Sequence, residues 1–149
     1  MNRRSRGFTV IEILVAIIIG SILTTIAIRE IRPSAGQVSA RQARNVFNGM
    51  AARARAQAIE TGERRILLVD TSGDSVSILA GGNVVETVRF RGELGIDIQA
   101  SATEIRLCMG PRGFADPSCN SFSSAVKVAF VRGGQSQTLE ILPLGQIRW

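Results

Sequence analysis

The longest hydrophobic stretch of the chain lies close to its start. Residues 8–28 read FTVIEILVAIIIGSILTTIAI, which is 21 residues with a single charged side chain, Glu12. As a helix, this stretch would span roughly 31 Å, about the thickness of the hydrocarbon core of a bilayer. The pattern therefore predicts a transmembrane helix over residues 8–28.

A short basic segment precedes this helix. Residues 1–7, MNRRSRG, contain three arginines and end in Gly7. Basic residues hold the flank of a membrane segment in the cytoplasm, which would put the rest of the chain outside, although Arg29 and Arg32 weaken the asymmetry. Secretory signals carry their small-residue cleavage site after the apolar run. Here Gly7 comes before it, so cleavage after Gly7 would leave the helix on the mature protein.

Glu12 is the most informative residue of the apolar run. A carboxylate in an apolar helix costs several kcal/mol unless it is paired. It could lie near the membrane interface and extend into water, or it could pair between subunits. After cleavage behind Gly7, Phe8 would carry a new α-amino group. A neighbouring subunit shifted by about one helical turn would bring that amine onto Glu12 and fix the register of the two subunits.

At this point the sequence resembles a known family. The run Gly7-Phe8-Thr9-Val10-Ile11-Glu12, followed by an apolar helix, is similar to the class III prepilin signature of type IV pilins and type II secretion pseudopilins. The resemblance implies that a prepilin peptidase of the bacterial inner membrane cuts between Gly7 and Phe8 and methylates the amine of Phe8. It also implies that the helix moves, at an inner-membrane assembly platform, into a helical filament of other pilins or pseudopilins.

The region 29–62 is expected to continue the N-terminal helix after an interruption. Pro33 and Gly36 predict a break, and Ser39 with Gln42 has the spacing of a capping box. The stripe at helical spacing that follows predicts a face packed on a sheet, and the arginines and asparagine opposite predict a solvated face, or one against lipid head groups or neighbouring subunits. The stripe is Ala43, Val46, Phe47, Met50, Ala54 and Ala58, and the polar face is Arg41, Arg44, Asn48 and Arg55.

Beyond Gly62 the pattern changes to alternation and short β-branched runs. Turn residues such as those at 71–74 and 81–83 separate the runs. The chain should therefore be an α+β protein, in which a long hydrophobic N-terminal helix precedes an antiparallel, sandwich-like domain of seven or eight strands over 63–149. The expected strands are 65–70, 75–79, 84–91, 96–99, 104–109, 125–131 and 138–142.

Composition excludes several kinds of chemistry. The chain contains no histidine, which excludes catalysis by Ser-His-Asp or Cys-His groups and histidine-ligated metals. Cys108 and Cys119 are too few for a four-ligand zinc site and fit one disulfide across an irregular loop at 110–124, or else two free thiols. A membrane-tethered enzyme is the competing class, but no nucleophile–base pair is visible. We expect no catalytic residue, no metal and no cofactor.

The order of segments refines the resemblance. A helix ending in Thr61-Gly62, a strand directly after it and an all-β remainder are similar to the minor subunits GspH and FimT. This resemblance implies a minor pseudopilin, GspH-like, of a type II secretion system that assists protein export across the outer membrane. The alternative is a FimT-like minor pilin of a type IV pilus, acting in assembly or DNA uptake. In both, the β domain would lie in the periplasm on a single-pass inner-membrane helix.

Charge leaves nucleic acid as an open partner. Removal of the leader would lower the net charge from +6 to +3. Some DNA-uptake relatives end in Gly-Arg-x-Arg, whereas this chain has Gly145-Gln146-Ile147-Arg148, which lacks the first arginine. We therefore expect weak phosphate binding, with Arg148, Arg132 and Lys127 as the residues that could contact DNA or a partner.

Overall fold

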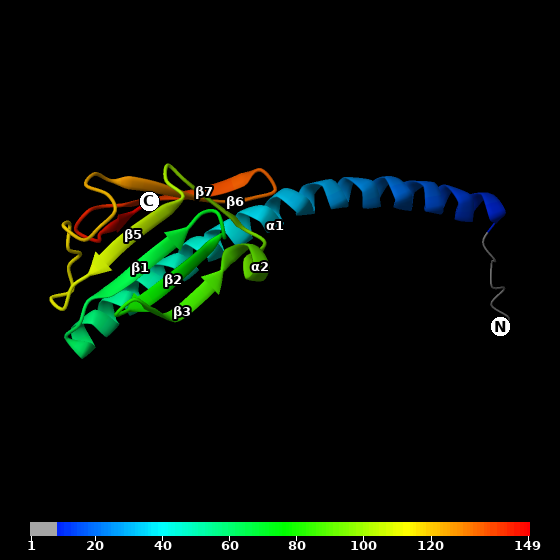
Figure 1. Cartoon of the computed structure of the whole chain (residues 1–149). Coiled ribbons are helices and arrows are strands. Elements are labelled where there is room, and N and C mark those ends of the chain that lie inside the picture. Colours follow the sequence, from blue (N-terminus) through cyan, green and yellow to red (C-terminus); the bar gives the residue numbers. More distant parts are fainter. Residues whose placement is uncertain (1–8) are drawn as a thin grey trace. The chain divides into compact units, whose positions relative to one another are not determined.

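The computed structural model describes residues 9–149, with side chains described for 9–26 and 36–149. The chain separates into two compact units, one up to Ala35 and one over Gly36–Trp149. Helix α1 (Val10–Thr61) contributes to both units. The second unit, called here the C-terminal unit, contains all the strands (Figure 1).

Helix α1 is continuous, so the predicted break at Pro33 and Gly36 and the new helix start at Ser39 are wrong. A proline removes one hydrogen bond from a helix and tends to kink it, and that local loss does not have to end the helix. Gly36 is buried, and a Cβ built on it would lie 2.9 Å from the carbonyl oxygen of Arg132. This glycine therefore permits a close approach to the end of a strand. The helix ends at Thr61, before Gly62 with its positive φ of 69°.

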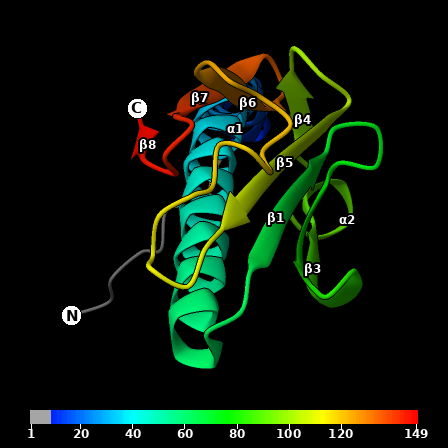
Figure 2. The ribbon, with the colours of Figure 1, turned by 60° about the vertical axis from the view of Figure 1, so that its left-hand side comes forward.

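Two four-stranded antiparallel sheets follow α1. One has the order β3-β2-β1-β5 and the other the order β4-β6-β7-β8. In Figure 2 the C-terminal part of α1 lies between the red C-terminal strand β8 and the green strand β1. The strands are β1 (Arg65–Asp70), β2 (Ser75–Ala80), β3 (Asn83–Arg89), β4 (Asp97–Ala100), β5 (Glu104–Met109), β6 (Val126–Arg132), β7 (Gln135–Ile141) and β8 (Ile147–Arg148). This arrangement confirms the predicted α+β fold.

A short helix, α2 (Phe90–Leu94), replaces the expected end of the third strand. Phe90 is fully buried and stacks on Phe130 of β6, with ring centroids 5.4 Å apart. Strand β3 lies at the edge of its sheet and is exposed along most of its length. If the strand continued through residue 90, Phe90 would stay at this edge and would not reach β6. Gly95, with a φ of 64°, ends the helix in the left-handed conformation that glycine adopts without strain.

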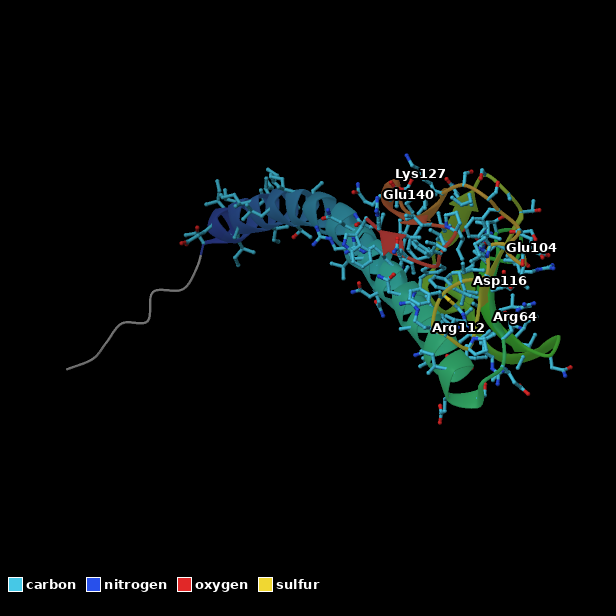
Figure 3. The ribbon with its side chains drawn as sticks, turned by 90° about the vertical axis from the view of Figure 1, so that its left-hand side faces the viewer. Arg64, Glu104, Arg112, Asp116, Lys127 and Glu140 are labelled. Carbon is cyan, nitrogen blue, oxygen red and sulfur yellow. A yellow bond between two sulfur atoms is a disulfide. The ribbon has the colours of Figure 1, made fainter. Side chains whose placement is uncertain are left out.

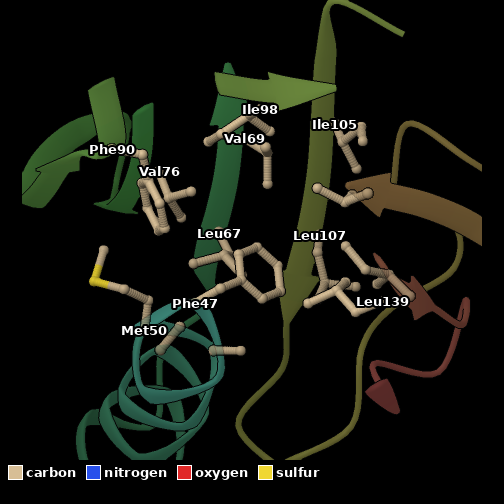
Figure 4. Close-up of a cluster of buried hydrophobic side chains, with 14 of the residues drawn as sticks. Phe47, Met50, Leu67, Val69, Val76, Phe90, Ile98, Ile105, Leu107 and Leu139 are labelled. Atoms are coloured by element: carbon tan, nitrogen blue, oxygen red, sulfur yellow. The ribbon is translucent and has the colours of Figure 1, made fainter. Parts of the chain in front are cut away.

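The core of the C-terminal unit lies between α1 and the inner faces of both sheets. The stripe predicted on α1 is confirmed, since Ala43, Phe47, Met50, Ala54 and Ala58 are fully buried. Figure 4 shows Phe47 and Met50 of the helix facing residues of both sheets. Those residues include Leu67, Val69, Val76, Ile98, Ile105, Leu107 and Leu139. One continuous apolar cluster therefore supports this unit without residues of the N-terminal unit.

Candidate functional site

The N-terminal half of α1 exposes almost only apolar side chains. Eleven large hydrophobic residues between Val10 and Ile26 are each 47–84% exposed. Its hydroxyl groups are bonded internally, since Ser21 donates to Ile18 O and Thr24 to Gly20 O. A helix that is apolar all round requires an apolar cover, which in proteins is either lipid or other helices. This segment therefore has the character of an interaction surface.

Glu12 lies in the first turn of α1. Its backbone N–H donates to Thr9 O at 3.1 Å and to Thr9 Oγ1 at 3.3 Å, so Thr9 caps the helix. The Thr9–Glu12 spacing is that of a capping box, a signal that the sequence analysis missed. Among the residues described, none forms a hydrogen bond or an ion pair with the Glu12 carboxylate. The helix dipole favours a negative charge at this end, by about 0.3–1 kcal/mol at an exposed position.

The predicted cleavage site, Gly7 and Phe8, lies outside the described residues. Among the helices that are described, none has a stretch long and apolar enough to cross a membrane. Within the same residues, no group of three or more potential ligand side chains is arranged to hold a metal ion.

The cysteines are joined in the structure. A disulfide connects Cys108, buried in β5, with Cys119, and their Cα atoms are 5.8 Å apart. The enclosed loop is also held by side chains, because Asn120 accepts from Cys108 N at 2.9 Å and donates to Pro143 O at 2.8 Å. Pro143 follows β7 of the other sheet, so this loop connects the two sheets.

Two carboxylates hold turns by bonding to nearby donors. Asp116 Oδ1 accepts from Ser118 Oγ and N, and Asp116 Oδ2 pairs with Arg64 at 2.8 Å. The Ser118 bonds, with a smaller effect of Arg64, lower the pKa of Asp116 below its ordinary value. Asp70 does the same in the β1–β2 turn, where bonds from Ser72 and Gly73 lower its pKa. Both groups act in structure, since each bonds to neighbouring donors of its own turn.

The three basic residues proposed for nucleic acid do not form one cluster. Lys127 and Arg148 both lie opposite Glu140 in the ladder of β6, β7 and β8, which puts a carboxylate between them. Figure 3 shows Lys127 and Glu140 next to each other. Arg132 is at the far end of β6, where it donates to Ser39 Oγ and to Leu94 O. The structure therefore provides no continuous basic patch built from these three residues.

The polar face predicted on α1 is only partly solvated. Arg41 is exposed, but Arg44, Asn48 and Arg55 are half-buried. The prediction failed because the C-terminal segment 143–149 lies against this face. Arg55 donates to Gly145 O at 2.7 Å, and the Arg44 guanidinium lies 5.4 Å from the ring centre of Trp149.

Comparison with known proteins supports the interpretation of the N-terminus. The profile of the prokaryotic N-terminal methylation motif matches residues 2–28. No curated protein sequence matches the chain.

The fold resembles that of a solved minor pilin. The crystal structure of type IV minor pilin FimU from Pseudomonas aeruginosa in space group P21 is similar, with a TM-score of 0.51 and 19% sequence identity. The match covers 78% of this chain and 89% of FimU. A second crystal form, P65, gives a TM-score of 0.49, 18% identity and coverage of 75% and 90%. The chain therefore combines the prokaryotic N-terminal methylation motif over residues 2–28 with a fold similar to that of the type IV minor pilin FimU.

Proposed function

We propose that the chain is a minor subunit of a type IV pilus-like filament, stored in the inner membrane and assembled through α1. The observation that carries the proposal is the exposed apolar half of α1, which directly follows a methylation motif. The C-terminal unit has its own core and needs no cover from that half. The apolar half is therefore available to lipid before assembly and to other helices afterwards. This function is structural and requires no catalytic group.

Glu12 would set the register of this assembly. Its carboxylate lies among exposed apolar side chains, and within the described part of the chain the helix dipole is the local compensation for its charge. Transfer into a filament core removes water, so a cationic partner becomes necessary. The methylated amine of Phe8 on a neighbouring subunit is a cation within reach of a one-turn shift. Pairing of the two groups would select one axial offset.

Processing and assembly can be tested separately. We expect mass spectrometry of the protein from its native host to show N-methylated Phe8 at the mature N-terminus, and Gly7→Val to leave the longer precursor in the membrane. Glu12→Ala should insert normally but enter filaments poorly. Ser21→Ala is the matched control, because Ser21 only bonds its own helix at Ile18 O. Normal maturation of Gly7→Val, or equal incorporation of Glu12→Ala and Ser21→Ala, would contradict the proposal.

Two machines use subunits of this kind. We favour a type IV pilus, because FimU, whose fold the chain shares, is a type IV minor pilin. Pseudopilin H of a type II secretion system is the second candidate, supported by the strand β1 that follows α1 after only three residues. Deletion of the gene distinguishes them. Loss of surface pili with normal protein export supports the pilus, and loss of export with normal pili supports the secretion system.

A further inference from the structure

A groove separates α1 from the last strand of the chain. It is lined on the helix by Asn48, Ala51, Ala52 and Arg55, which lie on one stripe at helical spacing. The opposite wall consists of residues 145–147 and Trp149, and the groove has a volume of about 370 Å³. No acidic residue lines it. We call it the α1–β8 groove.

Polar atoms without partners are buried along this stripe. Asn48 Oδ1, Arg55 Nε and Arg44 Nε have no hydrogen-bond partner within the described chain. Arg44 precedes Asn48 by one helical turn and contacts Trp149, so it extends the same stripe. A buried polar atom without a partner costs about as much as a lost hydrogen bond, and such groups usually meet water or a ligand. Asn48 and Arg55 line the groove and Arg44 lies beside it, so a ligand in the groove reaches this one acceptor and these two cationic donors once the side chains rotate outward.

The second wall is the free edge of a sheet. β8 is the outermost strand of its sheet, and Leu142 N donates to Gln146 O to close the β7–β8 hairpin. Along an antiparallel ladder, hydrogen-bonded residue pairs alternate with pairs that form no hydrogen bond to each other. The pair next to Leu142 and Gln146 is Ile141 and Ile147, which is therefore of the second kind. The N–H and C=O of Ile147 are therefore directed away from β7. An edge of this kind is a template for another strand.

Exposed apolar side chains surround the groove. Trp149 is 75% exposed at its wall, and Leu144 is exposed next to lining residue Gly145. Ile59 lies one turn beyond Arg55 and is close to Gly113, beside the exposed Phe114. Large apolar side chains that gather around a polar groove are typical of a surface for a protein partner.

We propose that the α1–β8 groove binds an extended, acidic peptide segment of a partner protein as an additional strand on β8. The backbone of the segment would pair with Ile147, and one of its N–H groups would donate to Asn48 Oδ1. A carboxylate of the segment would lie between Arg44 and Arg55. Strand addition of this kind takes its affinity from main-chain bonds and its specificity from side chains.

Trp149 reports directly on the groove, because it is the only tryptophan of the chain. The probe is the blocked pentapeptide Thr-Val-Glu-Val-Thr, titrated into the full chain in detergent micelles while tryptophan emission is recorded. Two matched peptides carry Lys in place of Glu or an N-methyl group on the central amide. We expect saturable binding of the glutamate peptide and roughly tenfold weaker binding of both others.

Variants locate the site. Asn48→Leu and Arg44→Gln should each weaken binding of the glutamate peptide by roughly tenfold. Arg41→Gln, on the exposed face of the same helix, should bind as the wild type does. If no peptide gives a saturable change at millimolar concentration, the groove holds only water and the proposal is wrong. Equal binding of the glutamate, lysine and N-methylated peptides to the wild type would also overturn it, whether or not the variants fold.

Discussion

Replacement of Asp74 tests whether one buried carboxylate holds the two sheets together. Asp74 lies in the turn between β1 and β2, and its side chain is 3% exposed. It accepts from Arg91 Nε at 2.6 Å and from the backbone N–H of Ile98 at 2.6 Å. Ile98 belongs to β4 of the other sheet. Asp74 therefore links a turn of the first sheet to the edge strand of the second.

The expected loss of stability depends on what each variant leaves unpaired. Asp74→Asn keeps an oxygen for the N–H of Ile98 and tolerates the positive φ of 47°, but it loses the charge facing Arg91. Because Arg91 is 69% exposed and can be hydrated, we expect a loss of about 1.5 kcal/mol in the free energy of unfolding. Asp74→Ala also leaves the N–H of Ile98 unpaired and puts alanine at a positive φ, so the loss should reach about 3–4 kcal/mol.

Urea unfolding of the full chain in detergent, followed by circular dichroism, measures these losses. Asp97→Asn is the matched control, because Asp97 contacts the same Arg91 at 2.9 Å but is 53% exposed. An exposed ion pair contributes little, so this variant should lose less than about 0.5 kcal/mol. If Asp74→Asn loses no more than Asp97→Asn, the link between the sheets does not depend on the buried charge.

Four further variants test other parts of the C-terminal unit, each by urea unfolding. Replacing Cys108 and Cys119 together by serine should lower the free energy of unfolding by about 2–3 kcal/mol, and an unchanged value would show that the loop needs no crosslink. Because folding lowers the pKa of Asp116, its carboxylate stabilises the folded chain at pH values above the ordinary aspartate pKa near 3.8. This stabilisation is lost as the pH falls through the folded-state pKa. Asp116→Asn should therefore flatten the fall in stability between about pH 5 and pH 2, and an unchanged slope would contradict this. Gly49→Ala should stabilise by about 0.5–1 kcal/mol, since among the described residues the nearest atom to the new Cβ beyond the local helix backbone is Arg53 Nη1 at 3.9 Å, whereas Gly36→Ala should destabilise against the Arg132 carbonyl. Equal effects of the two glycine changes would rule out the close approach at Gly36.

The β domain was predictable wherever alternation and turns act together. Strands β1 and β5 have the bounds that the sequence predicts, because buried and half-buried residues alternate along β1 and turn residues flank both strands. The prediction failed at Phe90, where burial against Phe130, some 40 residues away, favours a helical turn. It failed again at Gly36, because a glycine that permits close packing and a glycine that ends a helix have the same local sequence signal. Local patterns predict elements, and distant contacts decide their ends.

The methylation motif and the α1–β8 groove also differ in how well the sequence predicts them, because one is local in the chain and the other joins distant residues. The methylation motif is contiguous in the chain, over residues 2–28, so the sequence alone is enough to find it. The α1–β8 groove joins α1 to residues about 90 positions later, and on its own the α1 side looks like an ordinary solvated face. Only the fold shows that Asn48 is half-buried and that its Oδ1 has no partner in the described chain. A pilin-like subunit can therefore be recognised from its first residues, whereas its partners depend on surfaces that form only when the chain folds.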